Sequence, residues 1–291
     1  MKIIKYIEKL LRREFVKNVS VVLGGRVFAR ALPILISPVL TRIYTPEEFG
    51  IVALFMSVLN IGMMLSTGKY ERAIMLPKRR DHAASILNLS LVICLTVSLL
   101  LVVIFALFNE PVAKLLGNEK IAFWLYFIPI AVLLRGSFLI FTEWSNRNKK
   151  FKYVSSSFML QSSVSAGSRL GMGFAGMGTS GLILGNLFGF GSASFLLSYL
   201  TWKKDRFIFK SAFNKKRMLA LAKRYIKFPK YSLPSITINS ISLELPIFFI
   251  SNMFSSSILG FYSLANRMLL TPMDVLGRSV SEVYYQKAST V

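Results

Sequence analysis

Five arginine side chains lie inside long apolar stretches of the sequence, and their chemistry there is distinctive. Arg26 and Arg30 fall one helical turn apart in an apolar stretch that also holds Pro33 and Pro38. A guanidinium stays protonated in proteins, so it is a poor proton relay and a good bidentate ligand for phosphate or carboxylate. The predicted anion-binding residues are Arg26, Arg30, Arg135, Arg169 and Arg267.

Polar side chains recur at helical spacing near these arginines. Ser37 and Thr41 follow Arg26 and Arg30 at intervals that put all four on one face of a helix. Polar faces inside a membrane must meet each other or water rather than lipid, so several of them together predict a hydrated central cavity. The expected polar lining consists of Ser37, Thr41, Gln161, Asn239, Ser263 and Thr271.

Glu244 is the carboxylate nearest the centre of an apolar stretch, and it has two interpretations. It is either the counter-ion of an arginine or a group that couples an ion to transport. Because the arginines outnumber the buried acids, the predicted cavity carries surplus positive charge and calls for an anionic ligand. Plainer interpretations remain beside these: Arg26 snorkels or pairs with Glu244, and Arg135 and Arg169 are structural as readily as ligand-binding.

No arrangement typical of an enzyme is found in the sequence. It has no phosphate-cradling P-loop, no cluster of metal ligands and no nucleophile paired with a histidine. The single cysteine, Cys94, and the single histidine, His82, exclude a disulfide framework and argue against a zinc or haem site. We therefore expect no catalytic residue, no cofactor and no metal.

The elements that must position these residues are membrane-spanning helices. The chain of 291 residues is 54% hydrophobic and 17% charged, against about 25% charged in soluble domains, and its mean hydropathy is +0.55. Continuous apolar runs indicate an all-α, polytopic membrane protein rather than a β-barrel. The eight predicted spans cover residues 18–41, 48–67, 84–108, 120–142, 154–175, 180–201, 231–253 and 257–277.

The placement of charge predicts the topology. The net charge of +23 would suit nucleic acid, but outside the spans Lys and Arg alternate between dense and sparse links. They sum to 28 on one side and 3 on the other. By the positive-inside rule both termini are cytoplasmic. The charge therefore reflects orientation in a membrane, and we expect contacts with membrane lipids and none with nucleic acid.

The charge-rich link near residue 203 divides the chain. A shift of 210 residues aligns Gly50–Leu54 with Gly260–Leu264 and lays the first two spans on the last two, as in parallel repeats of six spans. A complete second repeat would need four more spans, so we expect a truncated protein. The predicted segments are an interfacial amphipathic segment at 1–17, a six-helix bundle at 18–202, a basic cytoplasmic linker at 203–230, and the first two helices of a second bundle at 231–291.

Several stretches resemble a known family. They include ARALPILISPVLTRIYTPEEFGIVALF (29–55), KFPKYSLPSITINSIS (227–242) and GFYSLANRMLLTP (260–272). The chain resembles the bacterial polysaccharide-biosynthesis flippases, the Wzx-type O-antigen and exopolysaccharide translocases of the MOP exporter superfamily, which includes MATE-type bundles. The likeness covers nearly the whole chain, although family members usually have twelve or more spans.

The resemblance implies a fold and a substrate. It implies two six-helix bundles in a V around a cavity, which move undecaprenyl-diphosphate-linked oligosaccharide to the periplasmic leaflet by alternating access. Related lipid II flippases line that cavity with arginines on the first and eighth helices, where Arg26, Arg30 and Arg267 lie here. A polysaccharide polymerase and a chain-length regulator are candidate partners.

Other functions stay open. A cation-coupled drug exporter of the same superfamily often carries cationic cargo, which a positive cavity disfavours. A membrane-embedded polymerase or glycosyltransferase would need catalytic acids or large periplasmic loops. A non-transporting component of a polysaccharide assembly complex would tolerate substitution of the arginines.

Overall fold

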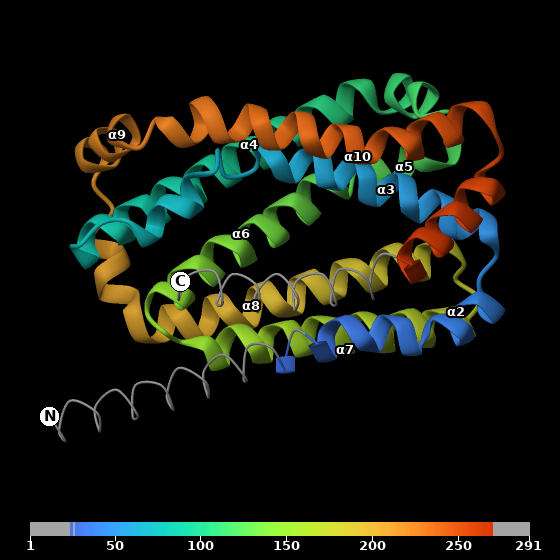
Figure 1. Cartoon of the computed structure of the whole chain (residues 1–291), viewed down its shortest axis with the longest axis horizontal. Helices are drawn as coiled ribbons and strands as arrows, with labels where there is room; N and C mark the ends of the chain where they lie inside the picture. The colour runs from blue at the N-terminus through green and yellow to red at the C-terminus, as the bar shows by residue number, and fades with distance from the viewer. Residues whose placement is uncertain (1–23, 26, 270–291) are drawn as a thin grey trace, which may run out of the picture.

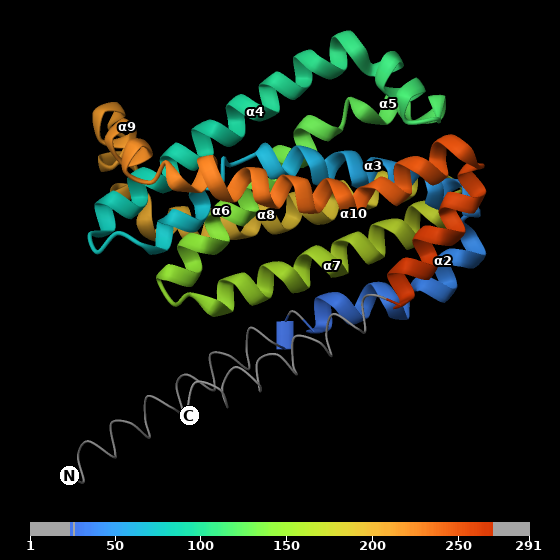
Figure 2. The same cartoon turned by 45° about the horizontal axis from the view of Figure 1, so that its top comes forward.

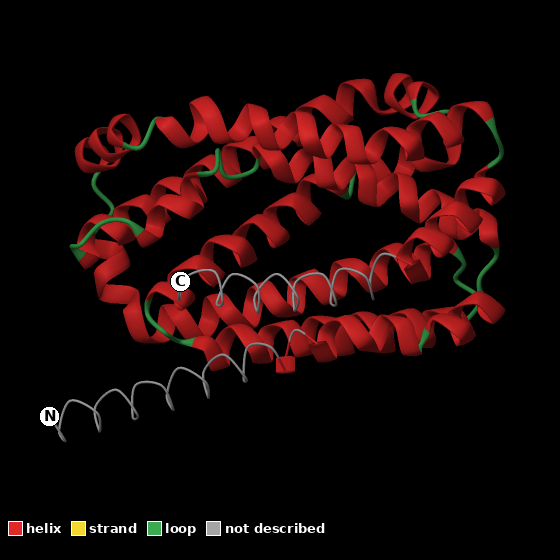
Figure 3. Ribbon diagram, in the orientation of Figure 1, coloured by secondary structure: helices red, strands yellow, loops and turns green. Residues whose placement is uncertain are grey.

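The computed structural model of the chain describes residues 24–25 and 27–269, and most of them are helical (Figure 1). No strand occurs among the described residues (Figure 3). The predicted all-α fold is therefore confirmed. The predicted interfacial segment at 1–17, Arg26 and Thr271 lie outside the described residues.

Helices follow one another with short connections. Helical residues 27–35 come first and helical residues 256–269 come last. Between them lie α2 (Ser37–Ile43), α3 (Pro46–Leu65), η1 (Tyr70–Met75), α4 (Arg80–Leu115), η2 (Glu119–Ile121), α5 (Ala122–Leu125), α6 (Ile128–Arg147), α7 (Phe151–Phe174), α8 (Thr179–Ser211), α9 (Lys215–Arg224), η3 (Phe228–Ser232) and α10 (Leu233–Met253).

Several span boundaries differ from the sequence prediction, most of all at the fourth and sixth spans. The fourth span was expected at 120–142, but α6 occupies Ile128–Arg147, because Pro129 sits at the first helical positions and favours a helix start there. The sixth span was expected to end at residue 201, but α8 continues to Ser211. Much of the basic linker at 203–230 is thus helical.

Five helices in the described part of the chain are long and apolar enough to cross a membrane. They are α3, α4, α6, α8 and the segment 228–253, in which η3 runs into α10. Helix α7 has 24 residues but is not one of the five, since serines, glycines, Gln161 and Arg169 interrupt its apolar residues. The chain is a multi-pass α-helical membrane protein.

The helices form layers around a shared core (Figures 1 and 2). Helix α7 packs along α8, α10 packs along α3, and α6 packs against both α4 and α8. The largest core lies where α3, α6 and α8 meet, and it includes Phe55, Leu59, Ile128 and Ile183. Polar residues that face away from this core are left to line the spaces between α3, α7 and α10.

The buried carboxylate of Asp205 connects several segments at the end of the bundle that carries the basic links. Asp205 on α8 accepts hydrogen bonds from Lys150 Nζ at 2.6 Å, Arg80 Nη2 at 2.8 Å and Trp144 Nε1 at 2.8 Å. Its side chain is 2% exposed. The contact joins the start of α4, the end of α6 and the α6–α7 link to α8, so these segments share one end of the molecule.

Two glycines make the closest backbone approach between α3 and the helical residues 256–269. A Cβ atom added to Gly50 would lie 2.1 Å from the Ser256 carbonyl oxygen, and one added to Gly260 would lie 1.8 Å from the Pro46 carbonyl oxygen. The shift of 210 residues pairs Gly50 with Gly260 and Pro46 with Ser256. Each contact is thus the counterpart of the other, as between elements related by a twofold axis.

Alanine at Gly260 is expected to destabilise the protein by about 1–3 kcal/mol, because overpacking forces the backbones apart. The measurement is the thermal midpoint of the purified protein in detergent. The matched control is Gly167→Ala on α7, where an added Cβ meets nothing within 4 Å and alanine has the better helix propensity. Equal midpoints for the two variants would contradict the close contact.

Candidate anion-binding site

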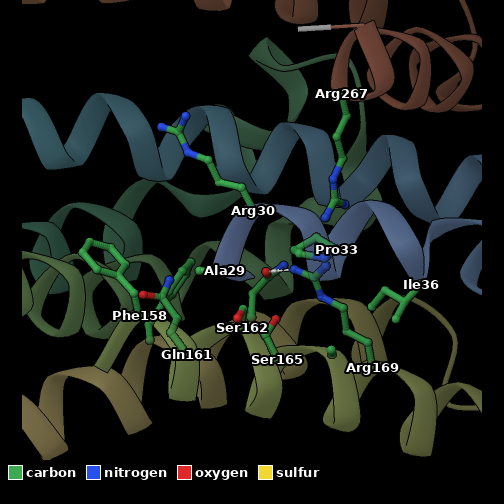
Figure 4. Close-up of a pocket in the computed structure, with 13 residues that line it drawn as sticks. Ala29, Arg30, Pro33, Ile36, Phe158, Gln161, Ser162, Ser165, Arg169 and Arg267 are labelled. Atoms are coloured by element: carbon green, nitrogen blue, oxygen red, sulfur yellow. Dashed lines mark hydrogen bonds between the residues drawn. The ribbon is translucent and has the colours of Figure 1, made fainter. Parts of the chain in front are cut away.

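A cavity of about 440 Å³ brings three of the predicted arginines together. Arg30 comes from the helical residues 27–35, Arg169 from α7 and Arg267 from the helical residues 256–269 (Figure 4). None of the described residues that line it is acidic. Three segments far apart in sequence therefore build one positively charged space.

Arg169 is held by its neighbours on one side only. The Tyr44 hydroxyl donates to the Arg169 backbone carbonyl at 2.6 Å, and Arg169 Nη2 donates to Asn186 Oδ1 on α8. Gly185 leaves room for the side chain, because a Cβ there would lie 2.6 Å from Arg169 Cγ. The buried Arg169 Nε has no hydrogen-bond partner among the described residues, so this donor is available to a ligand.

Arg267 points toward Arg169, whereas Arg30 extends away from both (Figure 4). Arg169 and Arg267 are close enough for their like charges to interact. Both also line a second cavity of about 610 Å³ between α3, α8 and α10. Two converging guanidiniums at the junction of two cavities repel each other, and an anion between them would relieve that repulsion.

Glu244 lies in the second cavity and is linked to Arg135 through an amide. Ser57 Oγ donates to Glu244 Oε2, Asn60 Nδ2 donates to Glu244 Oε1 at 2.9 Å, and Arg135 Nη1 donates to Asn60 Oδ1 at 3.0 Å. The Arg135 guanidinium also lies 5.2 Å from the centre of the Phe190 ring. The carboxylate and this arginine thus balance each other through Asn60 rather than by direct contact.

Asn60 was missed by the sequence analysis. The sequence does place this amide in the middle of a predicted apolar span, which could have drawn attention to it. The groups that Asn60 contacts, however, lie on α6 and α10, far from it in sequence. Their approach depends on how those helices pack against α3.

Leucine at Asn60 keeps the side-chain size and removes both hydrogen bonds. We expect the free energy of unfolding to fall by about 1–3 kcal/mol, since Arg135 and Glu244 are left without the amide that joins them. Thermal unfolding in detergent is the measurement. The matched control is Asn239→Leu on α10, whose amide is exposed, and a drop of equal size there would contradict the bridging role.

The other predicted residues are spread more widely. Gln161 lines the first cavity and Ser263 the second. Ser37 is buried, Thr41 is exposed and donates to the Pro38 carbonyl at 3.1 Å, and Asn239 is exposed. These last three line neither cavity.

We find no metal-binding site in the described part of the chain. No three His, Cys, Asp or Glu side chains gather there as metal ligands would. Arginine and amide side chains dominate the polar lining of both cavities instead, and these groups bind anions and hydroxyl groups.

Comparison with known proteins places the chain in a family. Over 252 residues it is 27% identical to the succinoglycan biosynthesis transport protein ExoT of Rhizobium meliloti (strain 1021). The alignment covers 85% of this chain and 48% of that protein, so the chain spans about half the length of this relative. No solved structure matches it. The family model described as polysaccharide biosynthesis protein matches residues 39–291, and the chain therefore belongs to the polysaccharide biosynthesis protein family.

Proposed function

We propose that the protein flips undecaprenyl-diphosphate-linked oligosaccharide repeat units across the bacterial cytoplasmic membrane, for O-antigen, capsule or exopolysaccharide synthesis. A relative named as a biosynthesis transport protein supports a transport role in polysaccharide synthesis rather than catalysis. The observation that carries the proposal is the convergence of Arg169 and Arg267 in a cavity whose described lining has no acid.

The diphosphate is the part of such a substrate that needs the arginines. Two guanidiniums offer paired N–H donors that match phosphate oxygens, and the Arg169 Nε donor has no described protein partner. Arg30 lines the same cavity and adds positive charge. The lipid tail would stay in the bilayer while the sugars occupy the hydrated space, and alternating access would carry the head group across.

Glu244 has a supporting role in this proposal. It lies on α10, and its partners Ser57 and Asn60 lie on α3. The carboxylate thus links the first bundle to the helix that would begin the second. We propose it as the group through which an ion couples to the movement of the two halves, because adding a proton would weaken its hydrogen bonds from α3.

The proposed orientation has both termini in the cytoplasm. The contacts of Asp205 with Arg80 and Lys150 gather three basic links at one end of the bundle. That grouping supports the topology that the positive-inside rule predicts. A polysaccharide polymerase and a chain-length regulator are the partner proteins proposed for this role.

The test is transport by the chain reconstituted in liposomes. The substrate is a fluorescent polyprenyl-diphosphate oligosaccharide, and the readout is its exposure on the opposite leaflet to a membrane-impermeant quencher. A cationic dye, tested in parallel, represents the drug-exporter alternative. Movement of the glycolipid alone supports the proposal, and movement of the dye alone overturns it in favour of the exporter.

A protein that moves neither compound would instead suit a non-transporting role in an assembly complex. Binding distinguishes this case, because a scaffold needs no affinity for the substrate. If the reconstituted protein binds no polyprenyl diphosphate and moves no glycolipid, the flippase proposal is overturned.

A further inference from the structure

A third cavity of about 390 Å³ lies between α6, α7 and α8. It adjoins the arginine-lined cavity, since Phe158, Gln161 and Phe190 line both. Its wall carries aromatic rings beside polar side chains, and Phe138, Thr142, Glu143 and Asn146 belong to it but not to the described lining of the arginine-lined cavity. The residues that matter for its chemistry are Phe138, Thr142, Glu143, Asn146, Phe158 and Gln161.

Two side-chain amides of this third cavity have hydrogen-bonding capacity that their described neighbours do not use. Asn146 and Gln161 are both partly accessible, and neither side-chain amide has a hydrogen-bond partner that we find in the described part of the chain. Thr142 donates to the Phe138 carbonyl at 2.7 Å, so its oxygen still has acceptor capacity. Amides that donate and accept in one place suit hydroxyl groups, which also do both.

The aromatic groups offer apolar surface next to these amides. The Phe138 and Phe158 rings meet edge to face, with centroids 5.1 Å apart and planes at 89°. Such a pair presents one ring face and one ring edge to the space beside it. A pyranose ring has C–H groups on its faces and hydroxyls around its rim, so this wall is complementary to a sugar.

Charge argues against a second diphosphate in the same place. Arg135 is the cation in the described lining of this cavity, and it already donates to Asn60. Glu143 adds a carboxylate to the wall. A lipid tail fits no better, because it would leave the Asn146 and Gln161 amides without partners at a cost of about 1–3 kcal/mol each.

We propose that this third cavity is the subsite for the glycan of the transported lipid, with Asn146 and Gln161 as the residues that bind sugar hydroxyls. The inference rests on the proposed flippase function. Arg169 and Phe158 are eleven residues apart on α7, or about 16 Å along the helix. This separation is longer than one sugar ring, so it suits an oligosaccharide whose diphosphate end lies at the arginines and whose outer sugars lie at the aromatic wall.

The experiment compares two probes on the purified chain in nanodiscs. One is a polyprenyl diphosphate without sugar, and the other carries an oligosaccharide. We expect Gln161→Leu and Asn146→Leu each to weaken binding of the glycosylated probe about tenfold, the usual effect of one lost hydrogen bond near 1.4 kcal/mol. For Asn146→Leu, whose side chain lines the third cavity and not the arginine-lined one, binding of the bare diphosphate stays within about twofold of wild type, which also shows that this variant is folded. Gln161 lines both cavities, so Gln161→Leu is read only on the glycosylated probe.

The exposed Asn239→Leu serves as the matched control and leaves both affinities unchanged. If Asn146→Leu keeps wild-type affinity for the glycosylated probe, or weakens binding of both probes equally, the glycan subsite is wrong while the flippase proposal stands. If wild type binds neither probe, the flippase proposal fails and the subsite fails with it.

Discussion

Alanine in place of Arg267 is expected to weaken binding of a polyprenyl diphosphate by at least about thirtyfold, and to stop translocation. Removing one partner of a desolvated charge contact typically costs about 2–5 kcal/mol. Arg169→Ala is expected to act similarly, because its side chain lines the same two cavities. The measurements are equilibrium binding in nanodiscs and the liposome transport assay.

Lysine at Arg267 gives a sharper version of the same test. It keeps the positive charge but loses the paired donors of the guanidinium, so we expect affinity between those of wild type and the alanine variant. The matched control is Arg42→Ala, since Arg42 is exposed at the end of α2. Transport at the wild-type rate by both Arg169→Ala and Arg267→Ala would remove the basis of the proposed function.

The second large effect is expected on folding, from alanine at Asp205. Its carboxylate is the shared acceptor for Lys150, Arg80 and Trp144, and the Lys150 side chain is only 10% exposed. Breaking a buried ion pair by removing one partner costs about 3–5 kcal/mol, because the remaining charge stays buried. We expect a large fall in folded yield and in the thermal midpoint in detergent.

Two further variants check the cause of that loss. Lys150→Met combined with Asp205→Ala removes the uncompensated charge as well, so it is expected to recover part of the lost stability. Asp81→Ala is the matched control: its side chain is 29% exposed in its pairs with Arg79 and Arg217, and exposed pairs contribute about 0–1 kcal/mol. Equal losses from Asp81→Ala and Asp205→Ala would contradict this account.

Much of this architecture could be predicted from the sequence, because hydropathy and charge act locally. Apolar runs predicted the helices, and polar faces within them predicted a hydrated cavity with arginines in its lining. The sequence did not predict which arginines meet, and Arg169 had a structural interpretation as readily as a ligand-binding one. The direction of the Arg30 side chain could not be predicted, since a helical face leaves the rotamer open. The start of α6 was placed eight residues too early because the apolar residues before Pro129 continue without a break.

The partners of the buried polar groups could not be predicted for a different reason. Asn60 and Glu244 are 184 residues apart, and Trp144 and Asp205 are 61 apart. Such pairs form only where the two helix faces pack together and where the two residues lie at the same level along the helix axes. The sequence marks Glu244 as a costly group that needs a partner, but many polar residues would satisfy it equally well. Asp205 was assigned to the basic linker at 203–230, and nothing in the sequence marked it as buried.

The contact of Gly50 with Gly260 has a kinetic consequence. Two backbones that touch through glycines have no side chains to interlock there, so one helix can turn against the other without rotamer changes. The contact also lies near the sparsely charged links, at the end opposite the Asp205 cluster. A methyl group at either glycine is therefore expected to slow the movement of the two helices and with it each transport cycle. The dissociation constant for substrate is expected to stay unchanged, because neither glycine lines the arginine-lined cavity.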